Sequence, residues 1–479
     1  MTVGPHRLLA IVMFAVLLVA GALVNRSQDK PTALQAAAAS APAGLMPTAA
    51  PTGALNATWY CPASPAGPSP GGVNTTALTI LNPTAASLTA RVTVVPSQGD
   101  AKTVTLPVNA RSRTGLYLTD VVKAPMAASI VDLDGGGAAV ELLVVGTGGW
   151  SATACASTAS EEWYFATGST DRDTTQLISL LNPFPDDAIV DLSFATDQGP
   201  SAPAEFQGLI VPARGLLVVN IADHVRRRSD VATTAKARAG RIVAGQYQVY
   251  GTPTPGVVLN LGAPSPGPTW TFPEGSVTNG QIEQYRIYNP GNREAELQLS
   301  FSLDQGTAEP FALTVPPQTA MTFVANDQAR IPKGVGHSAV LTSTNGVGVV
   351  AERLFIGAKP SLETGVGATL GARRTATDWA LPVGATNKTT VEVVSLFNPG
   401  PHPSTVSINA VSGGQMVAIP GLQALAIPSG GRLAVALNEH IISEDLGVVV
   451  AASEPVAVER DLYRFNGTGI SLAMAIPLS

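Results

Sequence analysis

Charged and aromatic residues are scarce in this sequence of 479 residues. Aromatic residues make up 5% of the chain and charged residues 13%, and the net charge is only −6. Proteins that bind nucleic acid usually gather Lys and Arg into a basic patch or stripe. Because no long basic stripe is present, we expect no nucleic-acid partner.

Cysteine and histidine are also rare. Two cysteines exclude a zinc ribbon or a disulfide-dense scaffold but leave room for one bridge. His224 and His440 each lie 12 residues after the proline of a Val-Pro or Ile-Pro pair, which indicates the same structural turn in two copies. Neither has a second histidine at ligand spacing, and no Gly-x-Ser-x-Gly elbow, P-loop or dinucleotide fingerprint is present. We therefore predict no catalytic residue, no metal and no cofactor.

Long hydrophobic runs are absent except for one near the N-terminus. Leu8 to Val24 contains 17 apolar residues without a charge, preceded by Arg7. This length lies between a signal-peptide core and a spanning helix, so residues 1–24 predict an uncleaved transmembrane anchor or a cleaved signal. Either alternative places the rest of the chain outside the cytoplasm. Residues 25–57 are rich in Ala and Pro and predict a disordered linker.

What the chain does contain is abundant Gly and Pro, 47 and 38 residues. Short strands joined by Gly/Pro turns suit this composition better than helices do. The length is too great for one core and predicts several domains. The fold class predicted is therefore all-β.

One sequence pattern recurs four times. Asn-Pro pairs follow apolar runs at spacings of 100, 107 and 109 residues, and four of the five tryptophans keep a similar spacing. Such internal periodicity indicates tandem copies of one unit. The signature residues are Trp59, Trp163, Trp270 and Trp379, with Asn82-Pro83, Asn182-Pro183, Asn289-Pro290 and Asn398-Pro399.

The residues around each Asn-Pro pair alternate between apolar and polar, which predicts strands with one buried face. Each following strand ends at a glycine-containing turn, and "LPV", "VPA", "VPP" and "IPS" open a further strand in each copy. About seven strands in roughly 105 residues is typical of an immunoglobulin-like β-sandwich, whereas a propeller blade uses about 40 to 50 residues. The predicted sandwich repeats are 58–158, 159–265, 266–374 and 375–479.

Asp186 and Asp187 sit in the loop after Asn182-Pro183, where paired carboxylates suggest either acid/base chemistry or a polar hairpin tip. The other three copies carry "TAAS", "GNRE" and "GPHP" at this place. Because the copies do not share the carboxylates, we interpret the loop as a hairpin tip.

Other charged groups have structural and functional interpretations. Glu352-Arg353 and Glu459-Arg460 recur near the ends of copies and predict structural pairs with cross-strand partners, or alternatively a binding-site carboxylate. The run from Arg226 to Asp230 indicates a solvated loop, with contact to an anionic polymer or lipid headgroup as the alternative. Asp132 to Gly137 suits a β-turn better than a calcium site.

The two cysteines fall in the first and last strands of the first copy. Cys61 is two residues after Trp59, and Cys155 lies in the closing segment. If the first and last strands meet within one sandwich, the two side chains come together. In an exported protein we predict a Cys61–Cys155 disulfide; two buried thiols, or a metal or redox role, are the alternatives.

The second copy contains Trp163-Tyr164-Phe165-Ala166, Asn182-Pro183 and Val211-Pro212-Ala213, and the third contains Ala351-Glu352-Arg353. With these motifs the chain resembles an uncharacterised family of membrane-anchored actinobacterial envelope proteins, domain of unknown function 5719. The second copy departs from the pattern at Ala244-Gly245-Gln246, and the first at Cys61. The resemblance implies repeat architecture and an envelope location, and it implies no reaction.

Together these features predict a non-enzymatic cell-envelope protein with a structural or interaction role. It would be held by its N-terminal helix in the cell membrane, or secreted after cleavage, with envelope proteins or cell-wall polysaccharide as partners. A glycan-binding module is the alternative, for which Tyr247, Tyr250 and Tyr285 are the aromatics of interest. A glycoside hydrolase is third and requires two carboxylates about 5 to 10 Å apart in a cleft.

Overall fold

Antiparallel β-strands dominate the computed structural model of this protein, as the composition predicts. The structure describes residues 46–306, 308–465 and 467–478. Gly44–Ser479 is one compact unit, whereas the predicted anchor 1–24 and most of the predicted linker lie outside the described residues. Across the part of the chain that is described, no helix is both long and apolar enough to span a membrane. Below, segments 1 to 4 denote the ranges 58–158, 159–265, 266–374 and 375–479.

Segment 1 contains two four-stranded sheets with orders β1-β6-β3-β4 and β5-β2-β7-β8. Their inner faces share one apolar core, to which Val92 and Val131 contribute from the first sheet and Ile80 and Leu142 from the second. The elements are β1 (Ala57–Ala66), η1 (Pro70–Gly72), β2 (Val73–Asn82), β3 (Leu88–Pro96), β4 (Lys102–Val108), β5 (Ser112–Tyr117), α3 (Leu118–Val121), β6 (Ala124–Leu133), β7 (Ala139–Gly146) and β8 (Gly149–Ala154).

Segment 2 has sheets ordered β12-β11-β15-β9, with β13 also on β11, and β14-β10-β16-β17. Its core is continuous with that of segment 1. The elements are β9 (Glu162–Phe165), β10 (Thr175–Leu181), β11 (Ala188–Thr196), β12 (Gly199–Ser201), η2 (Ala204–Phe206), β13 (Leu209–Val211), β14 (Leu216–Asn220), η3 (Ile221–Asp223), β15 (Val231–Ala239), β16 (Val243–Tyr250) and β17 (Gly256–Leu261).

Segment 3 repeats this arrangement, with orders β18-β23-β20-β21 and β22-β19-β24-β25. Tyr285, Phe301, Phe311 and Phe323 form an aromatic cluster in its core. The elements are β18 (Thr269–Phe272), β19 (Gln281–Asn289), β20 (Ala295–Leu303), β21 (Phe311–Val315), β22 (Thr319–Val324), η4 (Ala325–Asp327), β23 (His337–Ser343), β24 (Val350–Gly357) and β25 (Gly365–Leu370).

Segment 4 differs because one 18-residue strand, β32, runs without a break through two sets of partners. Its first half pairs with β26 and β28, and its second half pairs with β27 and β33. The elements are β26 (Ala376–Leu381), β27 (Thr390–Phe397), β28 (Ser404–Ser412), β29 (Gln415–Ala418), β30 (Leu425–Ile427), β31 (Arg432–Ala436), η5 (Leu437–Glu439), β32 (Gly447–Arg464), β33 (Ile470–Met474) and β34 (Ile476–Pro477).

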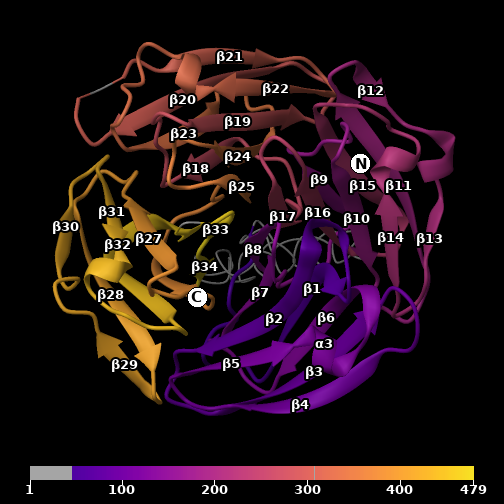
Figure 1. The fold of residues 1–479 in the computed structure, drawn as a ribbon, viewed down its shortest axis with the longest axis horizontal. Helices are drawn as coiled ribbons and strands as arrows, with labels where there is room; N and C mark the ends of the chain where they lie inside the picture. The colour runs from indigo at the N-terminus through magenta and orange to yellow at the C-terminus, as the bar shows by residue number, and fades with distance from the viewer. Residues whose placement is uncertain (1–45, 307, 466, 479) are drawn as a thin grey trace, which may run out of the picture. The chain divides into compact units, whose positions relative to one another are not determined.

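The last inner strand of each segment meets its counterparts from the neighbouring segments. Strands β8, β17, β25 and β33 contact one another in a closed cycle, and Figure 1 shows them near the centre of the view. A glycine precedes or opens each strand, and close approach requires it. A Cβ atom at Gly256 would lie 2.6 Å from Val366 Cβ, and one at Gly469 would lie 2.9 Å from Trp150 Cδ1.

Residues 46–54 join the two ends of the compact unit. The Ala49 N–H donates to the Pro477 carbonyl at 2.9 Å, and the Gly137 N–H donates to the Ala50 carbonyl at 2.8 Å. Ala49 is buried. These residues fall in the predicted disordered linker 25–57, but in the structure they bridge β34 and the turn after β6, so the prediction is wrong for this part of the linker.

Candidate functional site

The four Asn-Pro turns have one hydrogen-bonding pattern. In each, the buried Asn side chain accepts an N–H from two residues later at 3.0 Å and donates to the carbonyl four residues later at 2.8 Å. The same amide also donates to the last carbonyl of a distant strand, at Val108, Val211, Val315 and Ile427. The asparagine thus connects its own turn to the end of a strand that comes later in the same segment. This contact explains why Asn-Pro recurs in the four copies.

The four signature tryptophans are at most 1% exposed. Three of them donate their indole N–H to a buried carbonyl about 80 residues later, at Ile242, Val349 and Val456. Trp59 has no such acceptor among the described residues and lies instead against the disulfide. These residues therefore lie in the cores of their segments and present no binding surface.

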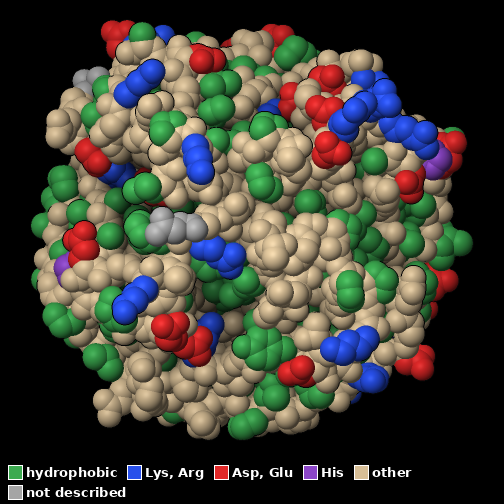
Figure 2. Space-filling model, in the orientation of Figure 1, with side chains coloured by type: hydrophobic (Ala, Val, Ile, Leu, Met, Phe, Trp, Pro, Cys, Tyr) green, Lys and Arg blue, Asp and Glu red, His purple; other side chains and the backbone are tan. Residues whose placement is uncertain are grey.

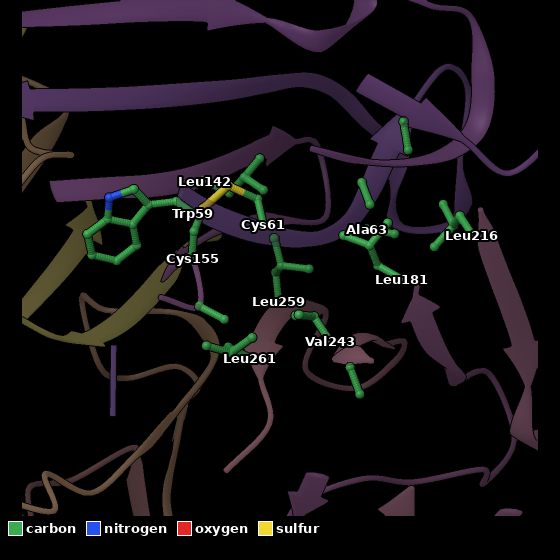
Figure 3. Close-up of a cluster of buried hydrophobic side chains, with 14 of the residues drawn as sticks. Trp59, Cys61, Ala63, Leu142, Cys155, Leu181, Leu216, Val243, Leu259 and Leu261 are labelled. Atoms are coloured by element: carbon green, nitrogen blue, oxygen red, sulfur yellow. A yellow bond between two sulfur atoms is a disulfide. The ribbon is translucent and has the colours of Figure 1, made fainter. Parts of the chain in front are cut away.

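The predicted disulfide is confirmed. Cys61 and Cys155 are bonded and fully buried. Figure 3 shows the bridge among Trp59, Leu142, Leu259 and neighbouring apolar side chains. An isolated β-bridge between Tyr60 and Ala156 holds β1 beside the residues that directly follow the last strand, β8, and so brings the two cysteines together.

A buried carboxylate joins segment 3 to segment 2. Glu352 in β24 accepts the backbone N–H of Ala166 at 2.7 Å and the hydroxyl of Thr167, both from the loop after β9. Burial raises the pKa of Glu352 to about 7, although these hydrogen bonds oppose the shift. The carboxylate therefore accepts a backbone N–H of a neighbouring segment, and it also lies opposite Arg286 in the adjacent strand β19, whose charge lowers its pKa.

Segments 3 and 4 meet at a larger charge cluster. Arg353 donates to Glu459 at 2.6 Å and to Asp461 at 2.9 Å, and all three side chains are at most 1% exposed. Glu459 also accepts the backbone N–H of Glu274 at 3.3 Å, while Glu274 pairs with Arg432 at 2.6 Å. The carboxylate again comes from the later segment and the N–H from the loop after the tryptophan of the earlier one.

Behind this cluster, Glu283 and His337 form a second buried pair at 2.9 Å. Burial raises the pKa of the Glu283 carboxyl, but His337 and Arg353 together outweigh this and hold the pKa below its usual value. For Glu459, burial dominates and raises the pKa to about 8, with Arg353 opposing. The cluster thus contains carboxyls whose environments move their pKa values in opposite directions.

Segments 4 and 1 close the cycle with the same device. Glu141 in β7 accepts the Val383 N–H at 2.8 Å and pairs with Arg460 at 2.8 Å, with both charged side chains fully buried. Arg113 adds a hydrogen bond to the Pro382 carbonyl at 2.6 Å. Nearby, burial raises the pKa of Glu392 to about 8.

Segments 1 and 2 lack this charge. Gly245 occupies the glutamate position, and a Cβ there would lie 2.2 Å from Pro62 Cβ. The Ala63 N–H donates to the Ser179 hydroxyl at 3.3 Å, and Tyr247 donates to the Pro70 carbonyl at 2.6 Å. An apolar core shared by the two segments replaces the charge cluster here.

The other residues named from the sequence are distributed over the molecule. Tyr247 and Tyr285 are each 1% exposed, so they cannot form a glycan-stacking face. His224 lies 3.7 Å from Glu205, and His440 lies 3.0 Å from the Pro420 carbonyl. Within the described ranges, no group of three or more His, Cys, Asp or Glu side chains is placed to hold a metal.

The charged loops make local contacts. Asp187 accepts the Ala213 N–H at 2.8 Å, which supports the hairpin-tip interpretation of its loop. Asp134 accepts the Thr89 N–H at 2.6 Å, and in the run from Arg226 to Asp230 the last residue pairs with Arg286 of segment 3. On the face shown in Figure 2, acidic and basic side chains lie close to one another and are not separated into areas of one sign.

Glu141 and the four glycines of the central strands are positions at the junctions that were not predicted from the sequence. Glu141, Glu352 and Glu459 occupy equivalent positions in their segments. The residue before each glutamate accepts, through its carbonyl, the N–H of the first residue after β8, β25 or β33. The glycines before or at the start of those strands recur at intervals of 104 to 109 residues. An alignment of the four copies over their full length contains both the recurrent glutamate and the recurrent glycines.

A groove of about 440 Å³ lies between segments 2 and 3. Tyr164, Thr234, Lys236 and Glu162 line it from the outer face of β9 and β15. Tyr288, Pro290 and Gln318 line it from segment 3. The groove is open to solvent and has both aromatic and polar walls.

Known proteins match parts of this chain. Residues 146–353 match the model of a family of unknown function, DUF5719. No curated protein matches. Among solved structures, Thermotoga maritima 1070 is 22% identical over 22% of this chain and 95% of its own, with a TM-score of 0.21. The Anabaena sensory rhodopsin transducer is 25% identical over 19% of this chain and 83% of its own, with a TM-score of 0.17.

Proposed function

We propose that this chain is a non-enzymatic cell-envelope protein with a structural or protein-interaction role. In this proposal four tandem immunoglobulin-like sandwiches, 58–158, 159–265, 266–374 and 375–479, close into one cycle outside the membrane. Residues 1–24 anchor the sandwiches in the membrane or are cleaved as a signal. The relatives of the chain are then an uncharacterised family of actinobacterial envelope proteins.

The observation that supports this role is the repeated use of one buried carboxylate to join consecutive segments. Removing a charge from water costs several kcal/mol unless it is paired and hydrogen-bonded. Glu141, Glu352 and Glu459 meet that cost with partners from a neighbouring segment. Arrangements of this kind fix the segments relative to one another, as a scaffold requires.

Cell fractionation of the full chain in an actinobacterial host tests the location. We expect the chain in the membrane fraction, or in the medium if residues 1–24 are cleaved, and digestion by protease added to intact cells. Recovery from the cytosol, protected from protease until lysis, would contradict the proposal. Chemical cross-linking in the same cells should join the chain to other envelope proteins.

A second candidate function, binding of a cell-wall glycan, is favoured by the groove between segments 2 and 3. Small-molecule sites are commonly clefts between domains with a few convergent polar groups. A glycoside hydrolase is a third candidate, and release of reducing sugar from cell-wall polysaccharide by the purified chain would favour it over both others.

A further inference from the structure

We propose that the groove between segments 2 and 3 binds a short, neutral glycan, with Lys236, Glu162 and Gln318 as its main polar contacts. This inference rests on the second candidate function and assigns a place to it. The ligand class follows from the hydrogen-bonding groups, the local charge and a comparison of the four junctions.

One wall of the groove is a connected row of polar groups. The Glu162 carboxylate accepts hydrogen bonds from the Lys236 ammonium at 2.6 Å and from the Tyr164 hydroxyl at 2.5 Å. The ammonium has two further donors and the carboxylate has further lone pairs. Lys236 is 61% exposed at its side chain, so these remaining donors face solvent and are available to a ligand.

Both segments supply hydroxyl and amide groups, with Ser193, Ser201 and Thr234 from segment 2 and Tyr288 and Gln318 from segment 3. Tyr288 and Thr234 share a hydrogen bond of 2.8 Å across the two segments. Ser193, Ser201 and Gln318 also line the groove, and their side chains make no hydrogen bond to any described residue. A ligand rich in hydroxyl groups can both donate to and accept from such a set.

The local charge favours a neutral ligand. The Glu162 carboxylate and Lys236 ammonium neutralise each other, and no other ionisable group except the two tyrosines lines the groove. The volume of about 440 Å³ lies in the range of sites for small ligands. Tyr164 and Tyr288 line the groove but are only 6% and 4% exposed, so the more exposed polar groups around them supply the contacts to a ligand.

The other junctions show that the architecture does not require these residues. Glu162 and Lys236 face each other beside Trp163, and the strand registers give the corresponding pairs beside the other tryptophans. Those pairs are Thr58 with Asp132, Thr269 with Thr342, and Asp378 with Ala451. The residue before the asparagine of the facing Asn-Pro turn is Tyr288 here but Leu181, Phe397 or Leu81 elsewhere.

Ligand-observed saturation-transfer NMR and calorimetry on the full chain test the inference. The chain is purified in a detergent without a sugar headgroup and titrated with maltotriose, cellotriose, mannotriose and chitotriose up to about 10 mM, which covers weak binding. We expect at least one trisaccharide to bind. Lys236→Ala and Gln318→Ala should each weaken it about tenfold, because each removes a hydrogen-bonding group from the site.

Thr342→Ala, which changes the residue that corresponds to Lys236 at the junction of segments 3 and 4, is the matched control and should bind like the wild type. Binding that is unchanged in both groove variants would overturn the groove while leaving glycan binding in place. Binding of none of the four trisaccharides would overturn the inference and the second candidate function together. Binding of sulfate or glucuronate in place of the neutral sugars would overturn the ligand class assigned here.

Discussion

The buried glutamates at the junctions are subject to two opposing effects. Burial disfavours their charged form, and pairing favours it. Glu141, Glu352 and Glu459 are fully buried, which disfavours their charged forms, yet each accepts an N–H from the neighbouring segment. A buried charge that loses its partner is far more costly than the net gain from the intact pair. The junctions are therefore sensitive to single substitutions.

Glu141→Ala should remove about 3–5 kcal/mol from the free energy of unfolding, because Arg460 would keep a buried charge without its carboxylate. Glu141→Gln should cost less, since its amide oxygen still accepts the Val383 N–H. Urea denaturation of the purified chain measures both. Glu296→Ala changes an exposed carboxylate and is the control; equal effects at positions 141 and 296 would contradict the prediction.

Stability should fall as pH rises from about 4.5 to about 8. Burial raises the pKa of Glu392 and of Glu459 from 4.5 to about 8, so the stability that each contributes is present below pH 4.5 and is lost as pH rises to the folded pKa. Each group contributes a slope of about 1.4 kcal/mol per pH unit in this window. The lowered pKa of Glu283 affects stability only at pH values below this window.

Melting temperatures between pH 5 and 8.5 check this slope. Glu392→Gln cannot ionise, so its melting temperature should fall less steeply with pH and exceed that of the wild type at pH 8.5. Parallel curves for the two proteins would show that Glu392 does not titrate in this range.

At the scale of the element, the Asn-Pro turn connects two strands that are far apart in sequence. The Asn182 side chain holds the Phe184 N–H and the carbonyls of Asp186 and Val211. The loop carboxylates that stand out in the sequence, Asp186 and Asp187, lie on the exposed side of this turn. The turn therefore depends on the amide and tolerates variation around it.

Asn182→Ala should cost about 2–4 kcal/mol, because it leaves backbone groups of the turn and of β13 without their hydrogen-bond partner. Asp186→Asn changes an exposed side chain and should change the free energy of unfolding by less than about 0.5 kcal/mol. Chemical denaturation of both variants gives the comparison. A similar loss for both would mean that the loop itself, and not the asparagine, maintains the turn.

The elements also show how far the sequence could be interpreted. Periodicity around Asn182 and Asn289 predicted strands, the all-β class is confirmed, and the placement of Cys61 and Cys155 predicted their bridge. The partners of Arg353 were out of reach, because they lie 106 and 108 residues away in another segment. The alternation of apolar and polar residues along a strand indicates which face is buried. It does not indicate whether the facing sheet or a neighbouring segment covers that face.

The groove shows the same limit. Glu162 and Lys236 are 74 residues apart and meet only through strand pairing, and Tyr288 arrives from the next segment. No motif in the sequence joins these residues. The sequence indicated Tyr247 and Tyr285 as the aromatics of interest, but the alternation places both in cores.

For the whole molecule, the contacts of residues 46–54 predict that the compact unit begins earlier than the sequence indicated. A chain that starts at Leu55 loses the Ala49 to Pro477 and Ala50 to Gly137 hydrogen bonds. It should be less stable by on the order of 2 kcal/mol. Differential scanning calorimetry against a chain that starts at Gly44 measures this loss, and equal melting temperatures would place residues 46–54 outside the cooperative unit.

Similar domains in one polypeptide can dock on the wrong neighbour while folding. The junctions of this chain differ in a way that discriminates among partners. Pro62 fits against Gly245 and would collide with a side chain there, whereas Arg353 needs the carboxylates of segment 4. Two of the four junctions thus identify the correct successor, and a chain with two segments exchanged would have a buried charge without its partner or a steric overlap at one or more new boundaries.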